Sequence, residues 1–216
     1  MTRRRQLTIP RHDVDALVAR ARSLVAPGSR RMLAIVGAPG AGKSTLATQL
    51  VDELGEDTAA LLGMDAFHFA QLELERTGLT DVKGAPETFD VLGLKAILKR
   101  LMARDDEVVH IPVFRRDLEE PIGSAIPVAR EVPLIIVEGN YLLSREGYWA
   151  SLSDFFADTW FLAPDEQDRM TRLIERHRRY GRSVEEARDR AWGSDQRNAE
   201  RICGTRQFAA VLVTGS

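Results

Sequence analysis

Apolar residues along the chain repeat with two periods, which predict helices and strands in alternation. Near the N-terminus they fall three, four or seven positions apart, the spacing of one helix face, over about residues 12–25. Further on, short apolar runs typical of strands alternate with segments in which apolar residues recur at helical spacing. The predicted strands are Arg31–Val36, Thr58–Met64, Glu107–Phe114, Pro133–Val137, Thr159–Leu162 and Ala209–Val213. This alternation favours a three-layer α/β/α fold around a mostly parallel sheet, with ligands at the carboxyl ends of the strands.

The stretch after the first of these strands reads Gly-Ala-Pro-Gly-Ala-Gly-Lys-Ser, a complete phosphate-binding loop (P-loop) pattern. Its context is the required one, because a strand precedes it and leucines at helical spacing follow it. The glycines let backbone N–H groups turn toward a phosphate, and the start of the following helix adds partial positive charge. We expect Lys43 to reach the β and γ phosphates and Ser44 to bind Mg²⁺. The residues predicted to bind the nucleotide, expected to be ATP, are Gly37, Ala38, Pro39, Gly40, Ala41, Gly42, Lys43, Ser44 and Thr45.

Composition narrows the class of protein. A chain of 216 residues fits one α/β domain spanning 1–216, and its formal net charge of −2 is not the balance of a nucleic-acid-binding protein. No run approaches the ~20 apolar residues of a membrane span. One cysteine, Cys203, offers no internal disulfide and fits a reducing cytoplasm. We therefore expect a cytoplasmic protein with neither nucleic acid nor membrane as partner, and a homodimer stays open.

Two carboxylates directly follow predicted strands, where side chains reach the ligand crevice. Asp65 ends the run Thr58–Met64, and Glu138 follows Pro133–Val137. A metal bound to a triphosphate needs an acid nearby, and an acceptor hydroxyl needs an oriented base. The alternative for each is an exposed carboxylate that caps a turn. His68, three residues beyond Asp65, fits either a structural histidine or one that contacts substrate.

Four segments then resemble a known family in chain order: residues 37–44, 64–68, 84–90 and 137–143. They are similar to the P-loop kinases of the uridine kinase, phosphoribulokinase and bacterial pantothenate kinase group. The likeness is strongest to a bacterial nucleoside/nucleotide kinase-like branch, often named as fructose-transport-system kinases. The resemblance implies an ATP-dependent transfer of the γ-phosphoryl group to a hydroxyl of a small metabolite, such as a sugar, a nucleoside or a pantothenate-like compound.

The same resemblance implies roles for individual residues. Asp65 would be the base for the acceptor hydroxyl, and Glu138 would hold Mg²⁺ together with Ser44. The segment from Pro86 to Asp90 would line the acceptor pocket, although Asp90 fits the N-cap of the next helix equally well. The residues expected to contact the acceptor are Asp65, His68, Pro86, Glu87, Asp90, Arg116 and Tyr141.

Two positions depart from the family pattern. Ala66 stands where relatives commonly carry glycine, and its methyl group could narrow the approach to Asp65. Arg115, in Phe114-Arg115-Arg116, stands where relatives commonly carry an acid. The added positive charge could favour a phosphorylated or carboxylate-bearing acceptor, or it could face solvent.

A helix predicted over residues 165–180 carries four arginines, Arg169, Arg172, Arg176 and Arg179, on one arc of about 80° at 100° per residue. Its position resembles the family lid, expected over about 165–192, and arginines there could neutralise charge on the transferring phosphoryl group. Arg172 and Arg176 are the predicted catalytic arginines, beside Lys43 and Asp65. An ordinary solvated helix with i, i+4 ion pairs is the alternative.

The rival function is a P-loop NTPase with a regulatory or nucleotide-binding role and no small-molecule acceptor. A regulatory GTPase would carry an Asn-Lys-x-Asp segment after a strand, and the sequence has none.

Overall fold

The computed structural model describes residues 6–215 and is built around a six-stranded parallel sheet. The strand order is β1-β8-β7-β2-β6-β3, and every neighbouring pair runs parallel. The strands are β1 (Leu7–Pro10), β2 (Arg31–Val36), β3 (Ala59–Gly63), β6 (Leu134–Gly139), β7 (Phe156–Ala163) and β8 (Val211–Thr214). The predicted α/β fold is confirmed. Strand β1 was not predicted, because four residues with three exposed show no clear alternation.

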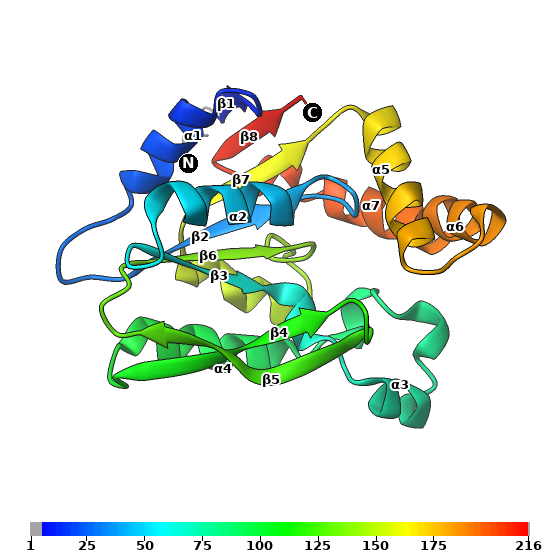
Figure 1. Cartoon of the computed structure of the whole chain (residues 1–216), viewed down its shortest axis with the longest axis horizontal. Coiled ribbons are helices and arrows are strands. Elements are labelled where there is room, and N and C mark those ends of the chain that lie inside the picture. The colour runs from blue at the N-terminus through cyan, green and yellow to red at the C-terminus, as the bar shows by residue number, and fades with distance from the viewer. Residues whose placement is uncertain (1–5, 216) are drawn as a thin grey trace.

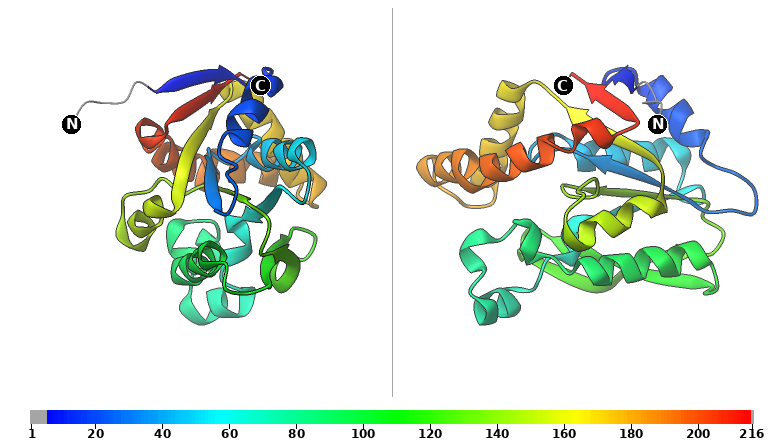
Figure 2. Two further views of the ribbon diagram at one scale, coloured as in Figure 1. Left: turned by 90° about the vertical axis from the view of Figure 1, so that its left-hand side faces the viewer. Right: turned by 180° about the vertical axis from the view of Figure 1, so that it is seen from behind.

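Helices cover both faces of the sheet because its central strands are apolar on both sides. Leu33 and Ile35 of β2 pack with α1 (Val14–Arg22) and α2 (Lys43–Leu54). Met32 and Val36 point the opposite way, as the two-residue period of a strand requires, toward α4 (Val91–Ala103), the 3₁₀ segment Gly147–Phe155 and α7 (Gln196–Cys203). In Figure 1, helix α2 crosses in front of the sheet. The right-hand view of Figure 2 is seen from behind, and there α7 crosses in front of the opposite face.

The predicted strand over residues 107–114 exists but does not join the main sheet. It is β4 (Val108–Arg115), which pairs antiparallel with β5 (Glu120–Ala129) in a separate hairpin. The hairpin lies with α4 beyond the β3 edge, on the lower side of both Figure 1 and Figure 2. Strand β5 escaped prediction because it is mostly exposed and contains two prolines and a glycine.

The region predicted to form the lid is helical and projects from one end of the sheet (Figure 1). Residues 165–192 form α5 (Glu166–Arg179), α6 (Val184–Arg190) and the start of a π-helical turn (Ala191–Asp195), which α7 follows directly. Asp165 caps α5 by accepting from the backbone of Gln167 and Asp168, and Ser183 opens α6 with a reciprocal capping box. His177 Nε2 lies 2.6 Å from Asp195 Oδ2 and ties α5 to the π-helical turn.

Shorter elements complete the chain. They are α3 (Gln71–Thr77) and the 3₁₀ turns Met64–Phe67, Thr80–Val82, Pro86–Thr88 and Arg206–Phe208. Over the described residues, no helix combines the length and apolar character needed to span a bilayer.

Candidate active site

The P-loop joins β2 to α2 at the carboxyl end of the sheet. Gly40 and Gly42 have φ angles of +82° and +90°, a left-handed conformation that other residues adopt only with strain. Gly42 is also the N-cap of α2, so the positive end of that helix faces the loop. The loop therefore has the conformation that binds phosphate oxygens through backbone N–H groups.

The Lys43 side chain turns back into the loop and is buried there. Its Nζ donates hydrogen bonds to the carbonyl oxygens of Gly37 at 2.9 Å and Ala38 at 3.3 Å, and to Asn140 Oδ1 at 2.8 Å. Burial lowers the pKa of Lys43 to about 8, although the nearby carboxylates of Glu138 and Asp65 oppose that change. Asn140 was missed by the sequence analysis, which had no signal for the side chain that orients the lysine.

Ser44 and Glu138 meet at the same edge of the sheet. Ser44 Oγ donates to Glu138 Oε1 at 3.0 Å, because α2 begins beside the end of β6. Burial raises the pKa of Glu138, against the opposing effects of Lys43 and of the serine hydrogen bond. Mg²⁺ binds through one or two protein oxygens together with phosphate oxygens and water, so this hydroxyl–carboxylate pair fits it. Among the described residues, no group of three or more His, Cys, Asp or Glu side chains could hold a metal ion by itself.

Asp65 lies just beyond β3, next along the sheet edge from Glu138. Arg116, which follows β4, donates from Nη2 to Asp65 Oδ2 at 2.8 Å. Burial disfavours the charged carboxylate, but the neighbouring His68 ring and the charges of Arg116 and Lys43 outweigh it and lower the pKa of Asp65. Asp65 is thus an ionised carboxylate held in one orientation. Ala66, the departure from the family pattern, is buried beside it.

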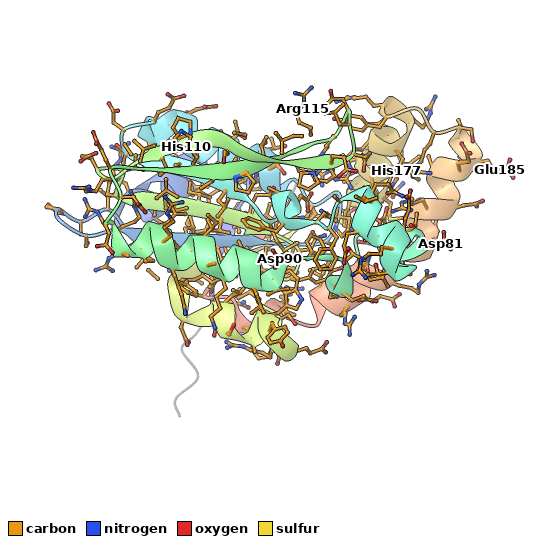
Figure 3. All side chains as sticks on the ribbon, turned by 90° about the horizontal axis from the view of Figure 1, so that it is seen from below. Asp81, Asp90, His110, Arg115, His177 and Glu185 are labelled. Carbon is orange, nitrogen blue, oxygen red and sulfur yellow. The ribbon has the colours of Figure 1, made fainter. Side chains whose placement is uncertain are left out.

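Arg115, the second departure, points away from this carboxylate. It forms an exposed ion pair with Asp117, with Nη2–Oδ2 and Nε–Oδ1 distances of 2.6 and 2.8 Å. Figure 3 shows Arg115 near the turn of the β4–β5 hairpin, with His110 toward the opposite end. Arg115 therefore faces solvent, which was one of its two predicted alternatives. The neighbouring Arg116 is the arginine that contacts Asp65.

The remaining residues predicted to contact the acceptor divide into packing and exposed positions. His68 Nδ1 donates to the Asp65 carbonyl oxygen at 2.8 Å, and its ring packs against that of Phe89 at a tilt of 39°, with a centroid distance of 3.9 Å. Burial lowers the pKa of His68, which favours the neutral ring. Tyr141 is buried, and its hydroxyl donates to the Gly84 carbonyl oxygen at 2.8 Å.

The segment from Pro86 to Asp90 forms a 3₁₀ turn and then the start of α4. Asp90 Oδ1 accepts from the Gly93 backbone N–H at 2.8 Å, so Asp90 is the N-cap of that helix, at the position that Figure 3 labels. Pro86 begins the turn, and Glu87 is exposed. The lid and α7 contact the start of this region, because Arg190 of α6 donates to the Lys83 carbonyl oxygen at 3.1 Å and Asn198 of α7 to the Gly84 carbonyl oxygen at 3.4 Å.

Arg169 is a structural arginine that fastens α5 to the P-loop. Its guanidinium is buried and donates to the Pro39 carbonyl oxygen at 2.8 Å, as well as to Glu166 and Gln196. At Gly40, a Cβ atom would lie 2.7 Å from the Arg169 carbonyl oxygen, so the helix and the loop approach as closely as glycine allows. Helical spacing placed Arg169 on the cationic face but could not identify this fastening role.

Arg172 and Arg176, which were grouped on one arc, have different surroundings. Burial and the charge of Arg116 lower the pKa of Arg176, while Asp65 opposes that change, so Arg176 belongs to the Asp65 side of the site. Arg172 instead lines a pocket of about 380 Å³ beside Ala41 and Gly42 of the P-loop, where its charge helps burial to lower the pKa of Arg11. The two arginines therefore lie in different surroundings, Arg176 near Asp65 and Arg172 in the pocket beside the P-loop.

Comparison with known proteins gives a consistent set of relatives. The chain is 34% identical to a "putative fructose transport system kinase" from Silicibacter sp. TM1040, whose crystal structure it matches with a TM-score of 0.83 over 92% of this chain and 98% of that one. It is 32% identical over 193 residues to the "uncharacterized protein YggC" of Escherichia coli K12, covering 88% of this chain and 79% of that protein.

A "putative uridine kinase" of Schizosaccharomyces pombe is 27% identical over 171 residues, covering 76% of this chain and 73% of that protein. Matches to pantothenate kinases span only 42–49% of those longer proteins. No protein-family model matches the chain.

Proposed function

We propose that this chain, which belongs to the P-loop kinase group that includes uridine kinase and pantothenate kinase, transfers the γ-phosphoryl group of ATP to a hydroxyl of a small metabolite. One observation carries this function. The Ser44–Glu138 pair, Lys43 and the Arg116-oriented carboxylate of Asp65 share one edge of the sheet. The oriented carboxylate of Asp65 would have no role in a nucleotide-binding module that transfers phosphate to no acceptor.

On the donor side, the P-loop N–H groups and Lys43 would hold the β and γ phosphates. Ser44 and Glu138 would hold Mg²⁺, which neutralises phosphate charge when bound. Phosphoryl transfer spreads negative charge over the γ-phosphoryl oxygens, so catalysis depends mainly on position and electrostatics. Arg176, on the Asp65 side of the site, would add a positive charge there when the acceptor is in place.

On the acceptor side, Asp65 would accept the hydrogen bond of the attacking hydroxyl and take its proton as the oxygen–phosphorus bond forms. ADP leaves with the electrons of the broken bond. Arg116 would act as a positioning residue, because its ion pair with Oδ2 leaves Oδ1 of Asp65 to face the acceptor. A base oriented in this way is typically worth about 10²–10⁴-fold in rate.

The acceptor pocket would lie between Asp65, His68 and the segment from Gly84 to Asp90, whose first residue accepts a hydrogen bond from Asn198 of α7. Mg²⁺, a cytoplasmic location and a homodimer stay predictions from the sequence.

The test is an acceptor screen with ADP release as readout, covering sugars, nucleosides, vitamins and their acidic and phosphorylated derivatives. At least one compound should raise ATP turnover at least about tenfold and gain one phosphoryl group by mass spectrometry. The matched variant Asp65→Asn should lose this stimulation but still bind ATP. ATP hydrolysis that is independent of every acceptor and survives Asp65→Asn would overturn the proposal in favour of a regulatory NTPase.

A further inference from the structure

An open cavity lies at the end of the sheet opposite the P-loop, because it forms where β2 begins and the P-loop follows where β2 ends. The segment before β2, the end of α4 and the segment between β5 and β6 enclose it. The lining residues are Gly28, Ser29, Arg30, Met102, Ala103, Arg104 and Arg130. Its volume of about 560 Å³ falls within the roughly 300–1,000 Å³ of small-ligand pockets. In Figure 1, β2 begins toward the left of the molecule, whereas α5 and α6 of the lid lie at the right.

Arg30 is a buried cation in this cavity, with only 4% of its surface exposed. Its guanidinium donates to the carbonyl oxygens of Leu101 at 2.7 Å, Ala129 at 2.6 Å and Val132 at 2.7 Å, and so fastens the surrounding segments together. Carbonyl oxygens supply hydrogen bonds but no full negative charge. A buried charge in a folded protein is normally paired with an opposite one, yet Arg30 forms no ion pair within residues 6–215.

Arg104 and Arg130 bring two further guanidinium groups to the same cavity. Arg104 Nε donates to the Arg130 carbonyl oxygen at 2.9 Å, and Arg130 Nη2 donates to the Asp105 carbonyl oxygen at 3.0 Å. Backbone groups thus hold both side chains in place, and their Nη1 groups make no hydrogen bond within the described part of the chain. Burial and then the charge of Arg104 lower the pKa of Arg30, while Glu131 opposes that change.

The acidic residues near this cavity do not cancel its charge, because none of them lines it. Asp106 is paired with Arg100, with an Nε–Oδ2 distance of 2.7 Å. Glu131 is exposed and forms no ion pair with any residue from 6 to 215. The cavity therefore gathers three positive charges and no negative one.

We propose that this cavity binds a small molecule through a phosphate group, at a site separate from the site of phosphoryl transfer. A guanidinium donates paired hydrogen bonds to phosphate oxygens, a geometry that the single ammonium group of a lysine cannot match. A phosphate monoester carries a charge of about −1.5 to −2 at pH 7, so it compensates three arginines better than one carboxylate does. The bound group would join the starts of β2 and β6 to the end of α4.

Met102 gives a local readout of this site, because it is the one methionine among the lining residues. The test titrates inorganic phosphate into protein labelled with carbon-13 at the methionine methyl groups and follows the Met102 signal by NMR. That signal is identified by its absence from the variant Met102→Leu. Sodium chloride at equal ionic strength and sodium acetate are titrated in parallel. Phosphate should shift the Met102 signal saturably, and neither of the other salts should.

Variants then locate the bound phosphate. Arg104→Gln and Arg130→Gln should each raise the Kd for phosphate about three- to tenfold, because each removes a charge-assisted contact. Lys99→Gln is the matched control, since it removes an exposed positive charge from α4 outside the cavity, and it should change the Kd by less than about twofold. Lys43→Ala should leave the Met102 response intact, because the P-loop lies at the other end of the sheet.

A Met102 signal that does not move, or that moves equally with chloride, would overturn the inference. Equal losses of affinity in Lys99→Gln and the two arginine variants would do the same, since the effect would then be one of general charge. Acetate that saturates the site as tightly as phosphate would refute the choice of a phosphate group. Loss of the response in Lys43→Ala would place the bound phosphate at the P-loop instead. None of these outcomes depends on ATP turnover, so they leave the proposed function to its own test.

Discussion

The contact between the P-loop and α5 leads to a quantitative prediction about two glycines. Gly40 and Gly42 both have left-handed φ angles, so replacing either by alanine adds conformational strain of about 1–2 kcal/mol. Only at Gly40 does the new Cβ atom also meet neighbours, at 2.7 Å from the Arg169 carbonyl oxygen and 3.1 Å from Leu173 Cβ. At Gly42 no heavy atom lies within 4 Å of that Cβ position.

Overpacking of this kind costs about 1–3 kcal/mol beyond the strain. Gly40→Ala should therefore lower the free energy of unfolding by about 2–5 kcal/mol, against about 1–2 kcal/mol for Gly42→Ala. For a protein of this size each kcal/mol corresponds to roughly 2–4 °C in Tm, so the two variants should differ by at least about 2 °C.

The assay is thermal unfolding followed by circular dichroism, without nucleotide, for the wild type and both variants. In a Leu173→Gly background, which removes the Leu173 Cβ atom, Gly40→Ala should have a smaller effect than it has in the wild type, because that close contact is gone. Equal Tm losses for Gly40→Ala and Gly42→Ala would refute the reasoning, since α5 would then not press on the loop.

Three further predictions concern the chemistry. Arg176→Ala should lower kcat by about 10²-fold with little change in KM for ATP, whereas Arg178→Ala, an exposed arginine on the same helix, should not; equal losses would contradict a role specific to Arg176. Asp65→Asn should lower kcat at least about 10²-fold at unchanged ATP Kd, and a near wild-type kcat would argue against a base there. Because the pKa of Lys43 is about 8 and only its protonated form attracts phosphate, ATP affinity should fall as pH rises from 7 to 9. A flat binding profile in that range would contradict this account of Lys43.

Much of the site could be predicted because its key parts are contiguous. The P-loop is one segment of eight residues, and its glycines, lysine and serine act through local backbone geometry that the sequence specifies directly. Glu138 and Asp65 could be placed because parallel strands end at the same edge of the sheet. The alternation of short apolar runs with helical spacing was sufficient to predict the fold class and every buried strand.

Other features depended on contacts between residues distant in the sequence. Only the folded structure decides that Arg116, and not Arg115, meets Asp65, or that β4 pairs with β5 outside the main sheet. It also separates Arg172 from Arg176 and brings Arg11 beside Arg172. Helical spacing specifies the face of the helix on which a side chain lies. The residues that the side chain contacts depend on which other elements pack against that face. That packing is decided by burial of the whole core, which the local sequence does not show.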